Sequence, residues 1–439
     1  MAEAARRLTT LAEQVLGAPL PVRVRAWDRS ESGPPGTPVL IVRRRRALRR
    51  LLWKPGELGL ARAWVAGDLD VEGDLYEAMD LLTGHLWERG EDSVRRSRPA
   101  ALLSALRDPA LRAACRELLL LAGPLPPPAP PREEARTGGG PLHTVRRDKQ
   151  AISHHYDVGN TFYERVLGPS MVYSCAYWGT DEDRAATLED AQRAKLDLVC
   201  RKLALKPGQR LLDVGCGWGS MALHAAREYE VRVVGITLSE EQAAYARKRV
   251  AEAGLTDRVE IRVQDYREVH DGPFDAISSI GMAEHVGSAR YAEYARDLYA
   301  LLEPGGRLLN HQIARRPLRD EADYRVDEFI DRYVFPDGEL APIGRTVAQL
   351  EQAGFEVRDV EALREHYALT LRAWVANLEA HWDEAVRLTS PGRARVWRLY
   401  MAASALSFER NRIGVNQVLA IRTPPGGESG LALRTRDWR

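Results

Sequence analysis

The chain has 439 residues, a formal net charge of +1 and 45% hydrophobic residues. This length exceeds what one compact core accommodates and predicts two or more units, and the near-neutral charge argues against a nucleic-acid-binding protein. The four cysteines show no C-x-x-C spacing, which argues against a zinc cluster or a disulfide framework and fits a reducing compartment. The sequence shows no signal-peptide core and no run of the ~20 apolar residues that span a bilayer, so we expect a cytoplasmic protein.

Residues 1–121 are predicted to form a smaller N-terminal α+β domain, because the Pro/Gly-rich segment 122–143 is typical of an extended linker. This domain contains seven basic residues between Arg43 and Lys54. We favour a solvated strand-and-turn surface for this run. The alternative is an anchor for anionic lipid headgroups, in which each cation near the surface adds ~1 kcal/mol.

From residue 144 to 439 the pattern alternates between apolar runs and amphipathic segments, which predicts a Rossmann-like, parallel-rich sheet with helices on both faces. Strands are expected at 209–215, 231–237, 259–265, 274–281 and 306–314, with a closing strand at 415–423. Helices are expected at 218–229, 239–254 and 291–303. Residues from about 315 to 410 are expected to form a mostly helical insertion rich in Tyr and Trp.

The motif D-V-G-C-G-W-G (213–219) joins the first of these strands to its helix. Its glycines permit a tight turn and close approach of a ligand to the backbone. A dinucleotide fingerprint, G-x-G-x-x-G, has its third glycine one residue later, and an acid usually ends the second strand, where this chain has Thr237. The turn therefore favours S-adenosylmethionine over a dinucleotide.

Several motifs, taken together, resemble the cyclopropane fatty acid synthase family, which includes the mycolic acid cyclopropane synthases. In the predicted catalytic domain they are H-H-Y-D-V-G-N-T-F-Y (154–163), V-Y-S-C-A-Y-W (172–178), L-L-D-V-G-C-G-W-G (211–219), S-I-G-M-A-E-H-V-G (279–287), R-Y-V-F-P-D-G-E-L (332–340) and H-Y-A-L-T-L-R-A-W (366–374). In the N-terminal domain, residues 58–75 resemble the longer, phospholipid-acting branch of the family. The resemblance implies a class I methyltransferase fold with a helical lid, and an N-terminal domain that associates with lipid.

The family transfers a methyl group from S-adenosylmethionine to the cis double bond of an acyl chain, which leaves a carbocation. Aromatic faces can stabilise such a cation, and Tyr177, Trp178 and Tyr367 are candidates. The resemblance implies a bound bicarbonate as the base. The residues expected to hold it are Cys175, Glu284, His311, the Ile313 backbone and Tyr367. The residues expected to bind the cofactor are Tyr173, Ser174, Asp213, Gly215, Gly217, Gly219, Thr237, Gln242, Asp265 and Tyr266.

Structural roles compete with these assignments. A buried cysteine is usually a small apolar residue, so Cys175 on its own would be part of the core. Glu284 could equally be favoured at a helix start by the helix dipole. We assign no catalytic role to His154 or His155, and Trp374 is expected in the core.

Two products follow from the same cation. Loss of a proton from the new methyl group closes a cyclopropane, whereas a hydride shift followed by deprotonation of a neighbouring carbon gives a methylene branch. Actinobacterial relatives make 10-methylene chains, which a separate reductase converts to 10-methyl chains. The Arg-rich composition (57 Arg, 6 Lys) and two departures from the family pattern, Ala283 and Asn310, favour the branched product.

We therefore expect an enzyme at the inner membrane surface that acts on unsaturated phospholipid chains, with no metal. The sequence does not fix its oligomeric state, and a homodimer stays open. One rival class is a methyltransferase for small amine or oxygen nucleophiles, which would need neither a bicarbonate site nor a lipid-associating domain. A non-catalytic lipid-binding protein is a weaker rival, because the cofactor turn and the base-holding positions are all present.

Overall fold

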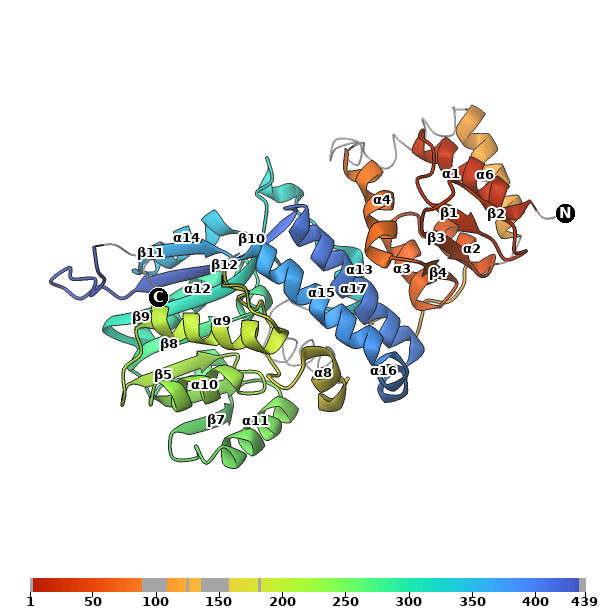
Figure 1. Cartoon of the computed structure of the whole chain (residues 1–439). Helices are drawn as coiled ribbons and strands as arrows, with labels where there is room; N and C mark the ends of the chain where they lie inside the picture. Colours follow the sequence, from red (N-terminus) through yellow and green to blue (C-terminus); the bar gives the residue numbers. More distant parts are fainter. Residues whose placement is uncertain (1–2, 89–108, 124–125, 136–157, 181–182, 434–439) are drawn as a thin grey trace. The chain divides into compact units, whose positions relative to one another are not determined.

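The computed structural model describes residues 3–88, 109–123, 126–135, 158–180 and 183–433 (Figure 1). Contacts divide the chain into unit 1, residues 1–136 with 390–406, and unit 2, residues 137–389 with 407–439. The predicted linker 122–143 lies partly outside the described ranges, as do His154 and His155, and the predicted domain bounds stay a prediction. Across the described ranges, no helix is both long and apolar enough to cross a bilayer.

Unit 1 combines a small mixed sheet with helices, as expected of an α+β domain. Its described strands run in the order β2 (Glu31–Ser32), β1 (Arg23–Arg25), β3 (Val39–Val42) and β4 (Leu69–Glu72). Its helices are α1 (Ala4–Leu16), α2 (Arg46–Trp53), α3 (Glu57–Val65), α4 (Leu75–Glu88) and α6 (Pro109–Ala122). The apolar faces of α1, α2 and α6 close over the sheet in one core cluster, which includes Leu8, Leu11, Val22, Val24, Leu48 and Leu121.

The basic run of unit 1 is a helix for most of its length, so the predicted strand-and-turn surface is wrong. Residues 46–53 form α2 because Ala47 and Leu48 lie on one buried face of an amphipathic turn. Arg46 donates to both carboxylate oxygens of the fully buried Asp68, at 2.9 and 3.2 Å for its Nε, and Arg50 Nε donates to the same side chain at 3.2 Å. Part of the run therefore serves the fold, since a buried carboxylate is tolerated only with such partners.

Residues 390–406, which we expected to belong with the catalytic domain, group with unit 1. They form most of α17 (Pro391–Glu409). The Trp64 indole N–H donates to the Arg395 carbonyl at 3.0 Å, and the Arg395 guanidinium donates back to the carbonyls of Trp64 and Leu69. These backbone contacts, which no local sequence pattern reveals, account for the difference.

Unit 2 contains the predicted sheet. Its strands run in the order β11 (Glu356–Ala362), β12 (Ile413–Ile421), β9 (Leu302–Arg315), β8 (Phe274–Ile280), β5 (Arg210–Val214), β6 (Arg232–Thr237) and β7 (Val259–Val263), and β10 (Ala341–Pro342) pairs with β9. Strands β5 to β9 are parallel, and β12 is antiparallel to both β9 and β11. The parallel-rich, Rossmann-like fold is thereby confirmed, including the closing strand near the C-terminus.

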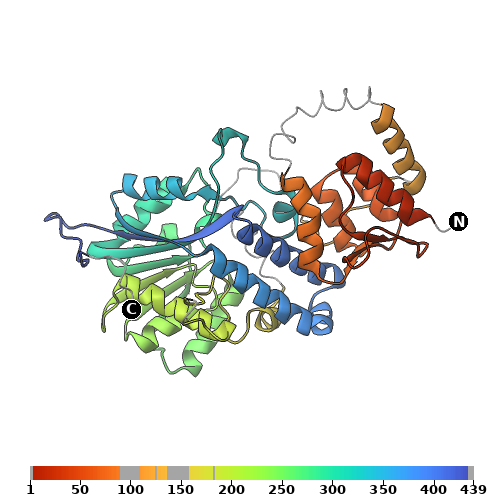
Figure 2. The same ribbon diagram turned by 45° about the horizontal axis from the view of Figure 1, so that its top comes forward.

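Helices cover both faces of this sheet (Figures 1 and 2). One face packs against α9 (Leu188–Leu203), α10 (Ser220–Glu228) and α11 (Glu240–Glu252), and the other against α12 (Tyr291–Leu301) and α14 (Ile343–Gln352). Neighbouring residues on one strand alternate between the two cores: Leu309 faces α9, whereas Leu308 faces α12. This alternation decides which side chains of β9 can meet.

The predicted insertion is only partly helical. Its helices are α13 (Glu328–Tyr333), α15 (Arg364–Ala380), α16 (Trp382–Leu388) and α17, whereas β10, α14 and β11 complete the sheet layer. The helix α8 (Asn160–Leu167) packs against α15. The prediction missed β11 because this edge strand, E-V-R-D-V-E-A, has charged residues in place of an apolar run.

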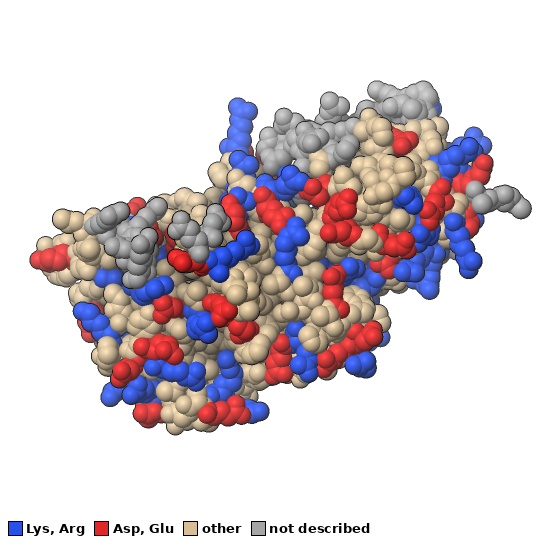
Figure 3. All heavy atoms as spheres, viewed as in Figure 1, with Lys and Arg blue, Asp and Glu red and all other residues tan. Residues whose placement is uncertain are grey.

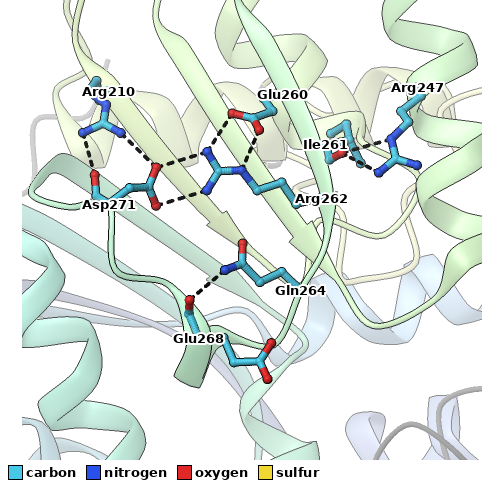
Figure 4. Close-up of polar contacts among 8 residues, drawn as sticks. All are labelled: Arg210, Arg247, Glu260, Ile261, Arg262, Gln264, Glu268 and Asp271. Carbon is cyan, nitrogen blue, oxygen red and sulfur yellow. Dashed lines mark hydrogen bonds and ion pairs between the residues drawn. The ribbon is translucent and has the colours of Figure 1, made fainter.

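Charged side chains protect the opposite edge of the sheet, at β7 (Figure 4). Arg262 bridges Glu260 and Asp271, and the Arg247 guanidinium donates to the Ile261 carbonyl at 2.8 and 3.0 Å. Charges on an edge strand disfavour pairing with another chain.

Candidate active site

The glycine turn forms one wall of a cleft at the carboxyl ends of β5, β6 and β7. Gly215, Gly217 and Gly219 all have positive φ, between 53° and 80°. A Cβ at Gly217 would meet nothing within 4 Å, whereas a Cβ at Gly219 would lie 3.1 Å from Ala246 of α11. Gly217 therefore leaves room for a ligand, and Gly219 allows the helices to pack closely.

Nearly all of the residues predicted to bind the cofactor line this cleft. They are Tyr173, Ser174, Asp213, Gly215, Gly217, Thr237, Gln242, Asp265 and Tyr266. Gly219 does not line it, for the packing reason just given. The cleft is partly open to solvent, and its empty volume, about 1180 Å³, includes solvent at the mouth.

Asp213 presents a free acceptor to the cleft. Its Oδ1 accepts from the Ser278 hydroxyl at 2.8 Å, and its Oδ2 is buried without a hydrogen-bond partner. Burial raises the pKa of Asp213 to about 6, against the opposing effects of Ser278 and Lys195. A ligand carrying an ammonium or hydroxyl group would satisfy this oxygen, as the amino-acid end and the ribose of an adenosyl cofactor do.

Lys195 of α9 is a cleft residue that the sequence prediction missed. It is 1% exposed, and its Nζ donates to the Ser174 hydroxyl at 2.9 Å. Burial lowers its pKa to about 8, partly offset by Cys175 and Asp213. The available signal was a lysine, one of six in the chain, on the buried stripe of a helix.

The remaining polar groups of the cleft are ordered by their neighbours. The Thr237 hydroxyl, at the end of β6, donates to Gln242 Oε1 at 2.8 Å. Asp265 caps the turn that follows β7 and pairs with Arg267 at 2.6 Å, so that Tyr266 is held against the cleft wall. A cofactor therefore meets side chains whose positions are already fixed.

A second group of predicted residues lies around the far end of β8 and β9. The chain leaves β8 at Gly281, whose N–H donates to the His311 carbonyl at 2.9 Å. The next amide on that edge of β9 belongs to Ile313, and it donates to Glu284 Oε1 at 2.7 Å. A carboxylate thus replaces the missing strand partner, which brings Glu284 and Ile313 together as predicted.

Glu284 keeps a second, unsatisfied oxygen. Although part of the residue is exposed, its Oε2 is buried and has no hydrogen-bond partner. Burial raises the pKa of Glu284 to about 7, opposed by the Ile313 N–H. Such a carboxyl group can take or release a proton near neutral pH.

His311 lies two residues before Ile313, on the α9 side of β9. It lies inside β9, which continues to Arg315, and it is level with Ile280, the last residue of β8. It is 2% exposed, and its Nε2 has no hydrogen-bond partner. Burial and the nearby Lys195 and Lys202 depress its pKa well below the usual value, so the imidazole is neutral.

Cys175 and Tyr367 join this group through Leu363. The Cys175 Sγ lies 3.6 Å from the Leu363 carbonyl, which also accepts from the Tyr367 N–H at 3.1 Å. The Leu363 N–H in turn donates to Val415, the register partner of Ile313. The five residues assigned to the base thus lie in one neighbourhood. Burial raises the pKa of the Cys175 thiol, so it is not an ionised nucleophile.

The aromatic residues are arranged differently from our expectation. The Tyr177 ring stacks on His366, with 4.8 Å between the ring centroids, and the Trp178 indole N–H donates to the Thr370 hydroxyl, so both rings contact the first two turns of α15. Tyr367 instead contacts Trp374 and Phe408, at 6.0 and 4.7 Å between ring centroids.

Trp374 is the central ring of this cluster. It is fully buried, lies 5.4 Å from the ring of Tyr173 in the cofactor cleft, and has an unpartnered indole N–H. An aromatic path therefore joins the cleft to Tyr367. Trp374 is buried, as we expected, but it also connects the two groups of site residues.

Asn310 lies on the opposite face of β9 from its neighbour His311. Its side chain faces α12, where its Oδ1 accepts from Tyr294 at 3.0 Å and its amide donates to Gln312 at 2.7 Å. Residues 310 and 312 point away from residues 311 and 313 because strand side chains alternate. Asn310 is therefore held by Tyr294 and Gln312 on the face of β9 opposite His311, and Ala283, its companion in the argument for a branched product, is buried and precedes Glu284 in the chain.

Comparisons with known proteins agree with this geometry. Residues 143–418 match the family model described as mycolic acid cyclopropane synthetase. A probable fatty acid methyltransferase of Mycobacterium tuberculosis is 46% identical over 94% of both chains. The cyclopropane-fatty-acyl-phospholipid synthase of Escherichia coli K12 is 39% identical, over 68% of this chain and 75% of its own. A crystal structure of a mycolic acid cyclopropane synthase complexed with SAH and CTAB superposes with a TM-score of 0.58, at 34% identity, over 62% of this chain and 98% of that one.

Proposed function

Because this chain belongs to the mycolic acid cyclopropane synthetase family and is an S-adenosylmethionine-dependent methyltransferase, we propose that it methylates the cis double bond of unsaturated acyl chains in phospholipids. The observation that carries this proposal is the pair of unsatisfied buried atoms, Glu284 Oε2 and His311 Nε2. A methyltransferase for amines or alcohols needs one proton acceptor, whereas a carbocation reaction on a lipid needs a dry pocket and a base held away from water.

The reaction balances without an oxidant or a metal. The methyl carbon leaves the sulfonium sulfur, whose bond electrons stay on sulfur as S-adenosylhomocysteine forms. The alkene π electrons form the new C–C bond and leave a cation on the adjacent carbon. Loss of one proton then neutralises the chain. The rings of Tyr173, Trp374 and Tyr367 would stabilise the cation by ~0.5–2 kcal/mol each where their faces are dry.

The residues around Glu284 fit a small oxyanion that also carries a proton, such as bicarbonate. Glu284 Oε2 is a free acceptor, and His311 is neutral with an unpartnered ring nitrogen. Glu284, His311, Cys175 and Tyr367 would hold the ion, whereas the Ile313 amide is already engaged by Glu284. Bound bicarbonate would supply the base for the departing proton, and Glu284, with its raised pKa, would receive that proton in turn.

The branched product is the one that we favour. A hydride shift moves the cation to the methylated carbon, and loss of a proton from the methyl group then gives a 10-methylene chain, the substrate of a separate reductase. The support for this choice is Ala283, a departure from the family pattern that is buried and precedes Glu284 in the chain. The alternative is cyclopropane closure, favoured by the similarity to the E. coli synthase. Gas chromatography with mass spectrometry of lipids from an expressing host distinguishes them, and a cyclopropane retention signature would reject the branched product.

We assign membrane association to the exposed residues at the two ends of α2 in unit 1. Arg44 and Arg45 are exposed and form no ion pair in the described ranges, and Trp53 is 58% exposed. Exposed cations and an exposed tryptophan on one short segment suit the interface of an anionic bilayer. Elsewhere on the face seen in Figure 3, basic and acidic side chains are interspersed. Binding at the inner membrane surface would therefore depend on this local group and not on net charge.

A small-molecule methyltransferase is the rival to this proposal. The two predict opposite results when S-adenosylhomocysteine release is measured with vesicles of unsaturated phospholipid and, separately, with a panel of small amines and phenols. Release only with vesicles is expected here. Release only with the small nucleophiles would favour the rival.

A further inference from the structure

A buried lysine lies behind the site and has no role in the chemistry above. Lys202 of α9 is fully buried. Its Nζ pairs with Glu361, lies 3.8 Å from Asp359, and donates to Gln417 Oε1 at 2.8 Å. The two carboxylates account for two of the contacts of the ammonium group, and the amide oxygen of Gln417 provides a third.

Three adjacent strands place side chains in a row beneath Lys202. Glu361 of β11 is the register partner of Gln417 on β12, and Gln417 is the register partner of His311 on β9. Directly opposite residues of paired strands point to the same face. The Gln417 amide nitrogen lies 3.2 Å from His311 Nδ1, so a continuous polar chain runs from Lys202 through Gln417 to His311.

The donors and acceptors of Lys202, Gln417 and His311 allow only one orientation of the Gln417 amide and one tautomer of His311. An ammonium group has donors and no acceptor, so the Gln417 atom beside Lys202 must be its oxygen. The Gln417 NH₂ group then faces His311 and donates to Nδ1. A neutral imidazole whose Nδ1 accepts a hydrogen bond carries its proton on Nε2. Reversing the amide would set an NH₂ group against an ammonium group.

We propose that Lys202 and Gln417 are positioning residues that hold His311 in the Nε2–H tautomer, so that a hydrogen-bond donor faces the site beside the Glu284 acceptor. This inference rests on the proposed function for its catalytic consequence, but the tautomer itself is independent of it. Lys195 and Lys202 both lie close enough to disfavour the imidazolium form. A group that orients a histidine through its second nitrogen acts in the same way as the outer partner of a metal-bound or catalytic histidine.

The tautomer is measured directly by ¹⁵N NMR of the full chain labelled at its ten histidines. The His311 signals are those missing from a His311→Gln variant. In the wild-type protein we expect an unprotonated Nδ1 and a protonated Nε2. A protonated Nδ1 in the wild-type protein would overturn the inference without recourse to any further variant.

Two substitutions test the hydrogen-bonded series Lys202–Gln417–His311, here called the relay. In Gln417→Glu, a carboxylate that accepts from Lys202 can only accept from His311 as well, so Nδ1 should become protonated. We expect kcat to fall at least ~10-fold, as for loss of an orienting partner, with little change in S-adenosylmethionine affinity. Lys202→Met should leave the amide free to reverse and give a mixture of tautomers. Lys206→Met, at an exposed lysine of the following turn, is the matched control and should leave both the spectrum and kcat unchanged.

The outcomes separate this inference from the proposed function. An unchanged His311 spectrum in Gln417→Glu contradicts the relay, whatever the enzyme methylates. If the spectra change as expected but no acyl chain is methylated, the relay stands as an orienting device and the proposed function fails.

Discussion

Replacing Glu284 by Gln should raise stability and abolish turnover in the same protein. Glutamine keeps the shape of the side chain and an oxygen for the Ile313 N–H, but it cannot take a proton or carry a buried charge. A carboxyl group retained only for structure would show the reverse, since its loss would weaken the fold. The substitution therefore separates a chemical role from a structural one.

The size of the stability change follows from the raised pKa. The folded pKa of Glu284 is about 7, against an ordinary value of 4.5, so the folded state holds the proton more tightly. Wild-type stability must then fall as pH rises from 4.5 through 7. The full difference corresponds to ~3 kcal/mol, at about 1.36 kcal/mol for each pH unit. By the same linkage, the wild-type protein has already lost about 1 kcal/mol of stability near pH 5. Because part of Glu284 is exposed, we treat ~3 kcal/mol as the upper value.

The assay is urea unfolding of both proteins at about pH 5 and pH 8, followed by probes of unit 2. We expect Glu284→Gln to gain ~1–2 kcal/mol more over the wild type at the higher pH, to bind S-adenosylmethionine normally, and to lose at least ~100-fold in turnover. Glu303→Gln, the same change at an exposed residue, is the control. An equal stability difference at both pH values, or unchanged turnover, would refute the reasoning.

Three further changes probe other parts of the account. Both Gly217→Ala and Gly219→Ala place a side chain at a positive φ, but only Gly219→Ala also forces a Cβ against α11, so it should lower the melting temperature more, at ~1–3 kcal/mol. Gly217→Ala should be the variant that weakens S-adenosylmethionine binding in calorimetry; equal effects of the two variants on both properties would contradict the separate roles. The double variant Arg44→Gln, Arg45→Gln should sediment less with anionic vesicles at low salt, by up to ~1 kcal/mol per cation, and unchanged sedimentation would support a merely solvated surface. Cys175 should resist iodoacetamide near pH 8 in the folded protein, because burial raises its pKa; rapid labelling detected by peptide mapping would show an accessible thiolate.

The sequence was a good guide to the central sheet. Short apolar runs placed β5, β6, β7 and β8 within about two residues, because a parallel strand that is covered on both faces carries apolar side chains on both of them. The same rule failed for β11, whose residues Arg358, Asp359 and Glu361 interrupt any apolar run at an edge of the sheet. The basic run of α2 was likewise misjudged, since its buried partner Asp68 is more than fifteen residues away in the chain.

The site was predicted in part. Motif residues such as Glu284 and His311 were identified from their resemblance to a family, and the fold brings them into one neighbourhood. Lys202 and Gln417 were not identified, because they are 215 residues apart and meet only where α9 packs on the sheet, and the register of β12 with β9 then sets Gln417 opposite His311. Nor could local sequence reveal that Asn310 faces Tyr294 of α12, which depends on the alternation of side chains along β9.

The most direct test of the central claim follows the methyl carbon. Purified protein is incubated with S-adenosylmethionine carrying a deuterated methyl group and with vesicles of cis-monounsaturated phospholipid, and the released fatty acids are analysed by gas chromatography and mass spectrometry. The account predicts label in the acyl chain, on a methylene branch at the former double bond. Formation of S-adenosylhomocysteine without any labelled acyl chain would contradict it.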